Sequence, residues 1–360
     1  MQKKHIIVGL SGGVDSSVTA CLLKKQGHHV TGVYMKNWDD DQAQCTSLSD
    51  EQDAKHVCEQ LDIDFSTVNF SKDYMDKVFA HMLSDLKKGH TPNPDILCNQ
   101  EIKFKVLLDY ALKNNAEFLA TGHYANIEST QGNNKLMMAK DQNKDQTYFL
   151  SRMPKEALNK VLFPIGNHQK SEIRELAKQF KLENALKKDS TGICFIGERK
   201  FSDFISDYLL NKPGIITDEV GKPIGKHNGL FYYTIGQRKG LGIGGMQNTP
   251  EDPWFVIKKD MQNNTLICVQ GDKHPALYHH GLSAQDIHWL INPDDLGDTF
   301  EAKVRIRHRQ TLQNAKITIQ NNQLTAHFET QQRAIAPGQS IVMYIGQCCI
   351  GSAIIEKPLN

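Results

Sequence analysis

The chain has 360 residues, of which 39% are hydrophobic and 23% charged, and its formal net charge is +1. This length predicts two or three domains at roughly 100–200 residues each, and the composition excludes wholesale disorder, collagen and a coiled coil. The near-neutral charge excludes a polybasic nucleic-acid binder, so any RNA site must be a local patch.

The first half of the chain alternates strand and helix patterns. Strands are expected at residues 5–10, 30–35, 65–70 and 118–121. Helices are expected at residues 16–26, 49–61, 74–88, 101–114 and 171–180. Strands that are separated by helices predict βαβ units and a parallel sheet.

The pattern changes after about Arg199. A short helix is expected at residues 201–210. Beyond it, β-branched and aromatic runs lie between turn residues, at 214–217, 231–235, 254–258, 265–269, 303–307, 315–319, 324–328 and 340–345. These runs predict an all-β sandwich or barrel. We therefore expect an α/β domain over residues 1–199, a small β-rich domain over 200–278 and a C-terminal β-barrel over 279–360.

Cysteine usage and the N-terminal sequence indicate the compartment. Eight cysteines in 360 residues are too few for a disulfide framework, and no Cys-x-x-Cys motif is present. The N-terminus leads directly into a strand pattern without an export signal, and no run approaches the roughly 18 apolar residues of a membrane span. We expect a cytoplasmic protein with reduced thiols, no metal site built from its side chains and no membrane partner.

Residues 11–17 read Ser-Gly-Gly-Val-Asp-Ser-Ser and lie between an expected strand and an expected helix. Gly12 and Gly13 allow the backbone to approach a bound anion closely, and the N–H groups of a helix N-terminus favour phosphate. The string is not a Walker A motif. The alternative is an ordinary glycine-rich turn with a serine cap, but the strand–turn–helix context favours a nucleotide site.

Two cysteines lie in segments rich in proline or glycine. Residues 91–99 read Thr-Pro-Asn-Pro-Asp-Ile-Leu-Cys-Asn, in which the prolines restrict the backbone around Asp95 and Cys98. A position near a helix N-terminus would favour the Cys98 thiolate. Residues 189–197 place Cys194 between glycines. Either cysteine alone is more often a small buried hydrophobe. The two together, beside a nucleotide loop, indicate a functional role.

A basic stripe is predicted near the C-terminus. Lys303, Arg305, Arg307 and Arg309 alternate along an expected strand and would share one face. Such a stripe can bind RNA phosphates in a chain that is neutral overall. The alternative is a solvated strand face.

Residues 11–16 resemble the pyrophosphate loop of the N-type ATP pyrophosphatases, which split ATP into AMP and pyrophosphate. With residues 9–16, Met35, 93–98, 122–123, 144–146, 190–197 and the β-rich tail, the chain closely resembles the bacterial tRNA-specific 2-thiouridylases. The resemblance implies an adenine-nucleotide α-hydrolase-like domain with a parallel sheet, followed by a small β-rich domain and a C-terminal β-barrel. It also implies 2-thiolation of the wobble uridine in tRNA.

The resemblance assigns roles residue by residue. The residues that would bind ATP are Gly9, Leu10, Ser11, Gly12, Gly13, Val14, Asp15, Ser16, Met35 and Gly122. Asn93, Pro94 and Asp95 would meet the target uridine, with Asp95 as general acid or base. Other tRNA contacts would be His123, Lys144, Asp145, Gln146, Arg307, His308 and Gln339. Cys98 would be the nucleophile and Cys194 the persulfide carrier, with a disulfide between them after turnover.

The implied reaction adenylates uridine O2 and replaces it with sulfur that arrives as a persulfide. ATP, its Mg²⁺ ion and persulfide sulfur are therefore expected, together with a sulfur-relay protein or cysteine desulfurase as donor. tRNA is the expected partner, and DNA is not. Two alternatives remain at this point. One is another adenylating enzyme, such as an amidotransferase-type synthetase, and the other is a non-catalytic RNA-binding protein.

Overall fold

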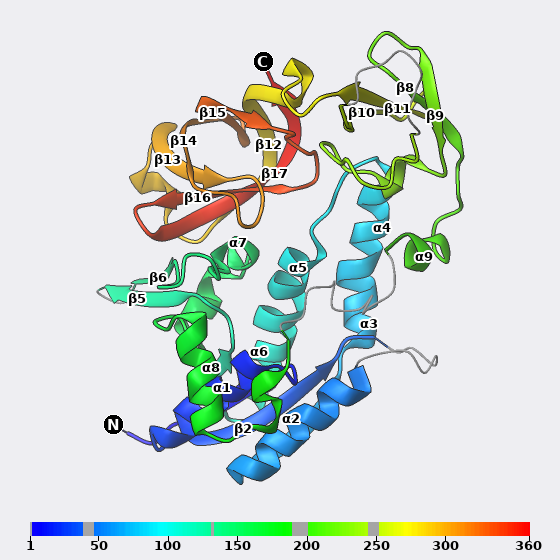
Figure 1. The fold of residues 1–360 in the computed structure, drawn as a ribbon. Helices are drawn as coiled ribbons and strands as arrows, with labels where there is room; N and C mark the ends of the chain where they lie inside the picture. Colours follow the sequence, from blue (N-terminus) through cyan, green and yellow to red (C-terminus); the bar gives the residue numbers. More distant parts are fainter. Residues whose placement is uncertain (1, 39–46, 131–132, 189–200, 244–251) are drawn as a thin grey trace.

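The computed structural model describes residues 2–38, 47–130, 133–188, 201–243 and 252–360. Figure 1 shows an α/β domain below, with a barrel and a smaller β-rich unit above it. Within the described ranges, the strands of the α/β domain form a parallel sheet of order β3-β2-β1-β4-β7. These strands are β1 (His5–Leu10), β2 (His29–Lys36), β3 (Asp64–Asn69), β4 (Phe118–Thr121) and β7 (Val161–Leu162). The expected parallel sheet is confirmed.

Helices cover both faces of this sheet because side chains alternate along each strand. Ile6 and Val8 of β1 pack in one cluster with Ala20 of α1 (Val14–Lys25) and Cys58 of α2 (Ser47–Leu61). On the other face, Ile7 packs in a cluster with Leu107 and Leu119. The core on both faces fixes the strand ends where the site lies.

Two long helices contain π-helical turns. One runs through α5 (Pro94–Leu97), the π-helical segment Cys98–Leu107 and α6 (Leu108–Lys113). It begins seven residues before the helix expected at 101–114, because the Asn93 side chain caps it by accepting from the Ile96 N–H at 3.3 Å. The other runs through α3 (Ser71–Tyr74), the π-helical segment Met75–Phe79 and α4 (Ala80–Lys87). π-Helical turns are rare in proteins, and those that occur are often found at functional sites.

Of the remaining helices, α8 (Lys170–Gln179) has ten residues and the others are shorter. α8 agrees with the helix expected at 171–180. α7 (Thr147–Leu150) and α9 (Phe201–Ser206) have four and six residues. Single 3₁₀ turns occur at Lys155–Asn159, Glu183–Leu186, Leu230–Tyr232, Pro275–Leu277 and Pro293–Asp295. Within the described ranges, no helix has the length and apolar character that a membrane crossing requires.

The middle unit contains a sheet of order β10-β11-β8-β9. Its strands are β8 (Gly214–Thr217), β9 (Pro223–His227), β10 (Trp254–Asp260) and β11 (Thr265–Gln270). The strand expected at residues 231–235 is wrong, since a 3₁₀ turn occupies Leu230–Tyr232. Leu230 and Tyr233 are both buried in the core of this unit, so the apolar run reflects the packing of a turn.

The C-terminal strands close into a barrel. The strands are β12 (Tyr278–Trp289), β13 (Thr299–Arg305), β14 (Gln313–Gln320), β15 (Gln323–Arg333), β16 (Ser340–Ile345) and β17 (Cys348–Leu359). Their order is β12-β15-β14-β13-β16-β17, and an antiparallel pairing of β12 with β17 closes the circle. Closure removes the exposed edges that an open sheet would leave. The expected β-barrel is confirmed.

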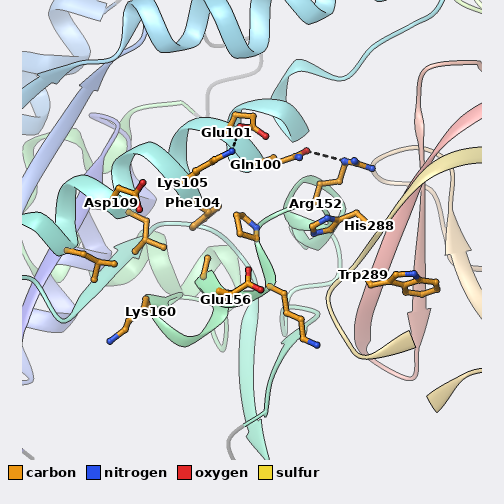
Figure 2. Close-up of a pocket in the computed structure, with 15 residues that line it drawn as sticks. Gln100, Glu101, Phe104, Lys105, Asp109, Arg152, Glu156, Lys160, His288 and Trp289 are labelled. Carbon is orange, nitrogen blue, oxygen red and sulfur yellow. Dashed lines mark hydrogen bonds and ion pairs between the residues drawn. The ribbon is translucent and has the colours of Figure 1, made fainter. Parts of the chain in front are cut away.

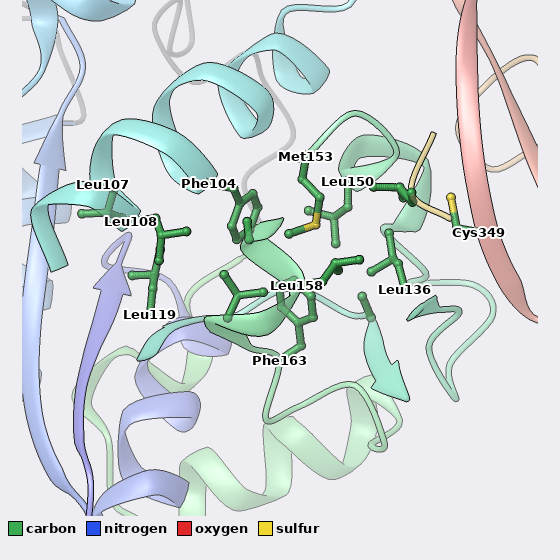
Figure 3. Packing of buried hydrophobic residues seen from close by; sticks show 14 of the residues in the cluster. Phe104, Leu107, Leu108, Leu119, Leu136, Leu150, Met153, Leu158, Phe163 and Cys349 are labelled. Carbon is green, nitrogen blue, oxygen red and sulfur yellow. The ribbon is translucent and has the colours of Figure 1, made fainter. Parts of the chain in front are cut away.

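A hairpin joins the α/β domain to the barrel. β5 (Asn126–Thr130) and β6 (Asn133–Met137) follow β4, and β6 pairs with β17 at Leu136 and Cys349. Figure 3 shows the buried cluster that runs from Leu119 near the sheet to Leu136 and Cys349 at the barrel. The two domains therefore share a core.

Candidate nucleotide and RNA site

The turn between β1 and α1 forms a narrow backbone cradle. Gly12 has a φ of +71°, and a Cβ built on it would lie 2.3 Å from the Asp50 carbonyl oxygen. A residue with a side chain would be strained and would also clash there. Gly13 is the N-cap of α1 and supplies no side-chain cap. The N–H groups of the first turn are therefore available to an anion.

Hydroxyl groups hold the cradle in shape. Ser16 Oγ accepts from the Ser11 N–H at 3.2 Å, and Ser17 Oγ donates to the Gly13 carbonyl at 2.9 Å. Asn184, which the sequence analysis did not identify, donates through Nδ2 to the Gly12 carbonyl at 3.1 Å and to Ser17 Oγ at 2.9 Å. No local pattern signals Asn184, because its partners lie about 170 positions earlier in the chain.

The Asp15 carboxylate, at the N-terminus of α1, is held by a cation. Lys170 Nζ lies 2.8 and 2.9 Å from its two oxygens, and the Tyr124 hydroxyl donates to it at 3.0 Å. A bare carboxylate in this position would repel phosphate, and Lys170 compensates its charge. Lys170 and Tyr124 are additional site residues that the motif did not contain.

The end of β4 presses against the start of α1. A Cβ on Gly122 would lie 2.6 Å from the Ser16 backbone nitrogen, so this approach requires glycine. The next residue, His123, hydrogen-bonds through Nδ1 to Thr121 Oγ1 at 2.8 Å. Burial, with a contribution from the charge of Lys103, lowers the pKa of His123 well below its usual value. The imidazole is therefore neutral at physiological pH.

Gln146 fixes the same loop from the other side. Its Oε1 accepts from the Tyr124 N–H at 2.9 Å, and its own N–H donates to the Tyr124 carbonyl at 2.9 Å. The structure therefore gives Gln146 a role in shaping the loop that follows β4. An RNA contact would have to use its remaining amide NH₂.

The helix of Asp95 faces the same region as His123. Burial raises the pKa of Asp95, and the charge of Lys103 opposes that rise. The charge of Lys103 thus affects both pKa values. The geometric link is Phe104, which lies in the same long helix and whose ring lies 5.7 Å from the His123 ring. Lys103 was not predicted, since a lysine in a helical pattern is usually a solvated surface residue. Met35, near the end of β2, packs against the adjoining hydrophobic clusters.

Cys98 lies one turn inside its helix. Its N–H donates to the Pro94 carbonyl, and the residue is 5% exposed. It belongs to an aromatic cluster that includes Trp38, Phe79 and Phe204. The suggested position at a helix N-terminus is therefore wrong by about one turn, over which the helix dipole effect falls off. Cys194 and the rest of residues 189–197 lie outside the described residues.

Asp145 and Arg305 form a buried ion pair. Arg305 Nη1 lies 2.8 Å from Asp145 Oδ2, to which Thr147 Oγ1 also donates at 2.7 Å. The Asp145 side chain has an exposed fraction of 0%, so the expected contact of its carboxylate with tRNA is not available in this structure. Asp145 instead joins the α/β domain to the barrel.

The predicted basic stripe is wrong as a single exposed face. Lys303 and Arg309 are exposed, but Arg305 is buried. Arg307 is half-buried, and its Nη2 donates to the carbonyls of Ile235 and Ala334. β13 ends at Arg305, so the alternation does not continue along one strand.

Basic groups from two domains do meet in another place. A cavity of about 580 Å³ is lined by Gln142, Asn143, Lys144, Arg305, Arg309, Gln310, Thr311 and Leu312, and we call it the basic cleft. Its described lining contains three basic side chains and no acidic one; Arg305 is paired with Asp145, and the other two are Lys144 and Arg309. Beside it, the His308 ring lies 4.3 Å from the Phe149 ring. A cleft with this charge suits a phosphate backbone.

A second cavity, of about 630 Å³, lies elsewhere (Figure 2). Its lining mixes acidic and basic side chains, and Arg152 Nε there donates to Gln100 Oε1 at 3.1 Å. It contains none of the predicted site residues. In the part of the chain that the structure describes, no group of three or more His, Cys, Asp or Glu residues could hold a metal ion.

The cradle and the paired Asp15 define an ATP-pyrophosphatase-like nucleotide domain that is joined to a β-barrel. Three family matches divide the chain. They are described as "tRNA methyl transferase HUP domain" over residues 4–198, "tRNA methyl transferase PRC-barrel domain" over 202–270 and "Aminomethyltransferase beta-barrel domain" over 279–355.

Curated relatives match the whole chain. A protein named "tRNA-specific 2-thiouridylase MnmA 1" from Geobacillus kaustophilus is 52% identical over 100% of this chain and 97% of its own length. A tRNA-specific 2-thiouridylase MnmA from Legionella pneumophila is 53% identical over 99% of each. The chain belongs to the tRNA-specific 2-thiouridylase family of sulfurtransferases, and the resemblance seen in the sequence is confirmed.

A solved structure of the U34-tRNA thiolase NcsA from Methanococcus maripaludis is more distantly similar. It matches 57% of this chain and 63% of its own length at 21% identity, with a TM-score of 0.37.

Proposed function

We propose that this chain catalyses the ATP-dependent 2-thiolation of the wobble uridine of tRNA. The observation that carries the proposal is that the loop after β4 contacts both the turn between β1 and α1 and the helix that carries Asp95. Gly122 packs on the N-terminus of α1, and the ring of the next residue, His123, lies 5.7 Å from that of Phe104 in the helix that carries Asp95. The loop after β4 thus contacts both the phosphate site and the helix that carries the half-buried Asp95 carboxyl group, and adenylation of a base would use both.

The first step activates uridine O2. This oxygen attacks the α-phosphorus of ATP, the bond to pyrophosphate breaks, and AMP becomes the leaving group at C2. The phosphate loop, residues 11–17, would hold the leaving pyrophosphate through backbone N–H groups. Residues 9–16, Met35 and Gly122 are proposed to bind ATP. Mg²⁺ commonly binds to phosphate and water with few protein ligands, which fits the absence of a carboxylate cluster among the described residues.

The second step delivers sulfur. The terminal sulfur of a Cys194 persulfide attacks C2, a C–S bond forms and AMP leaves. Cys98 then attacks Cys194 Sγ, which releases thiouridine and leaves a Cys98–Cys194 disulfide for a reductant to reopen. In a second route, Cys98 first attacks Cys194 Sγ of the persulfide, which forms the disulfide and releases sulfide, and the sulfide then attacks C2 and displaces AMP. Asp95 is proposed as the general acid or base beside the uridine. A sulfur-relay protein or a cysteine desulfurase would load Cys194 in the cytoplasm.

The domains divide the work in this proposal. Residues 1–199 carry out catalysis, residues 200–278 form the central unit, and residues 279–360 bind tRNA with the α/β domain. Lys144 lies in the basic cleft, and His308 lies beside it. Asn93 and Pro94 would meet the uridine beside Asp95. Asp145, Gln146 and Gln339 shape the site through protein contacts in the structure.

The proposal is tested with purified chain, ATP, a persulfide donor and two tRNAs that differ at one base. We expect AMP release and 2-thiouridine with a wobble uridine, and neither with a wobble cytidine. Equal AMP release with both tRNAs would favour a different adenylating enzyme. Binding of tRNA without any AMP release would favour the non-catalytic alternative.

A further inference from the structure

A turn of the barrel touches the segment that precedes the Asp95 helix. Gln339 Nε2 donates to the Thr91 carbonyl at 2.7 Å and lies 3.5 Å from the Pro92 carbonyl. The Thr91 N–H donates to the Pro337 carbonyl at 2.8 Å. The barrel thus binds both backbone groups of Thr91, although the two segments are separated by about 250 positions.

The turn itself is anchored in the barrel. The Gly338 N–H donates to the Ile355 carbonyl at 2.9 Å, and the Ile355 N–H donates to the Gln339 carbonyl at 2.8 Å. Gly338 has a φ of +88°, and a Cβ there would lie 2.8 Å from the His90 Cβ. The contact is therefore closely packed, and the two hydrogen bonds with Ile355 of β17 hold the turn in place.

Thr91 is three residues before the start of the helix that contains Asp95 and Cys98, so holding Thr91 in place restrains that helix. Pro92 and Pro94 limit the backbone on either side of Asn93, whose side chain caps the helix. Asp95 lies in the first turn of this helix and Cys98 in the next. A displacement of Thr91 would therefore move Asp95 and Cys98 relative to the phosphate loop.

We propose that Gln339 is a positioning residue, which sets the Asp95–Cys98 helix through Thr91 and Pro92. The proposal rests on the proposed function for its kinetic consequence, but not for its structural one. It gives the Gln339 amide a contact within the protein, in addition to the tRNA contact that the sequence resemblance implied. The barrel then contributes to the rate of the reaction as well as to RNA binding.

Two variants test this proposal without adding charge. Gln339→Met keeps the length of the side chain and removes the donor, whereas Gly338→Ala pushes a methyl group toward His90. Gln323→Met is the matched control, because Gln323 donates to Glu356 at 3.0 Å on an exposed part of the barrel. Amide hydrogen exchange over residues 90–98 is measured in the free protein, and tRNA affinity and single-turnover thiolation are measured in parallel.

We expect Gln339→Met to speed exchange over residues 90–98 and to slow single-turnover thiolation at saturating tRNA about tenfold, since small misplacements of reacting groups cost rate. Gly338→Ala should do the same and Gln323→Met neither. Unchanged exchange at 90–98 in Gln339→Met, with weakened tRNA binding, would overturn the proposal. If the wild-type protein does not thiolate tRNA, the proposed function fails, and the exchange measurement still decides the positioning role.

Discussion

The guanidinium of Arg305 and the carboxylate of Asp145 lie 2.8 Å apart, although 160 positions separate them in the chain. Their side chains are 7% and 0% exposed. Arg305 also lies over the Tyr344 ring, 5.5 Å from its centroid. This ion pair connects the loop before α7 to the barrel strand β13, close to the basic cleft.

The pair predicts a large effect on stability. Asp145→Ala should lower the free energy of unfolding by about 3–5 kcal/mol, because it leaves Arg305 buried without its counter-charge. Urea denaturation measures the loss. Asp145→Leu combined with Arg305→Met should recover part of it, since two apolar groups leave no buried charge. Asp76→Ala, which removes an exposed partner of Lys72, should leave the stability nearly unchanged. If the Asp145→Ala variant is as stable as the wild type, water solvates the ion pair in solution, and the pair is not buried as the structure shows.

Asp15 and Lys170 predict a defect confined to ATP chemistry. Asp15→Ala frees Lys170 and the Tyr124 hydroxyl from their acceptor at the N-terminus of α1. We expect AMP formation to be lost while tRNA affinity is retained, because the basic cleft does not include these residues. Assays of AMP release and tRNA binding separate the two effects, with Asp73→Ala as a surface control. Normal AMP formation by Asp15→Ala would remove this turn from the mechanism.

Asp95 predicts linked effects of pH on activity and stability. Its pKa is raised by burial, so the folded state holds this proton more tightly than the unfolded state. This group alone therefore lowers stability as the pH rises from the unfolded pKa through the folded one. Asp95→Asn should raise the thermal midpoint at neutral pH and have little effect once the carboxyl is protonated in both states.

In the same pH experiment, activity should fall as the pH drops through the folded pKa of Asp95, because a protonated carboxyl cannot act as a base. Lys103→Met removes the charge that opposes the raised pKa, so the acid limb should move to higher pH. A pH–rate profile of AMP formation measures this shift. An acid limb at the same pH in Lys103→Met and wild type would contradict the assigned coupling.

The basic cleft predicts how tRNA binding depends on salt. Arg309→Ala and Lys144→Ala should each weaken binding and reduce the slope of log K against log salt by about one unit, as expected for one lost phosphate contact. Lys316→Ala, an exposed lysine on β14 outside the cleft, is the control. If Lys316→Ala reduces the slope and the cleft variants do not, tRNA lies on another face of the barrel.

Local patterns predicted the parallel sheet because β1, β2 and β4 are short runs rich in buried residues that alternate with helices along the chain. They predicted the cradle at Gly12 and Gly13 because the positive φ of Gly12 is a local requirement of the turn. They did not predict the exposed hairpin β5–β6, in which few positions are buried. They placed Arg305 in a solvated stripe, since its partner Asp145 is distant in sequence. Lys170, Asn184 and the Gln339 contact were missed for the same reason.

The central claim is tested most directly by mass spectrometry of wobble uridines in tRNA from cells that lack this chain. The account predicts that 2-thiouridine disappears at that position, returns with the wild-type chain and does not return with Cys98→Ser or Cys194→Ser. Both variants should still form AMP, because ATP cleavage belongs to the phosphate loop. Unchanged 2-thiouridine in cells without the chain, or its full return with either cysteine variant, would contradict the account.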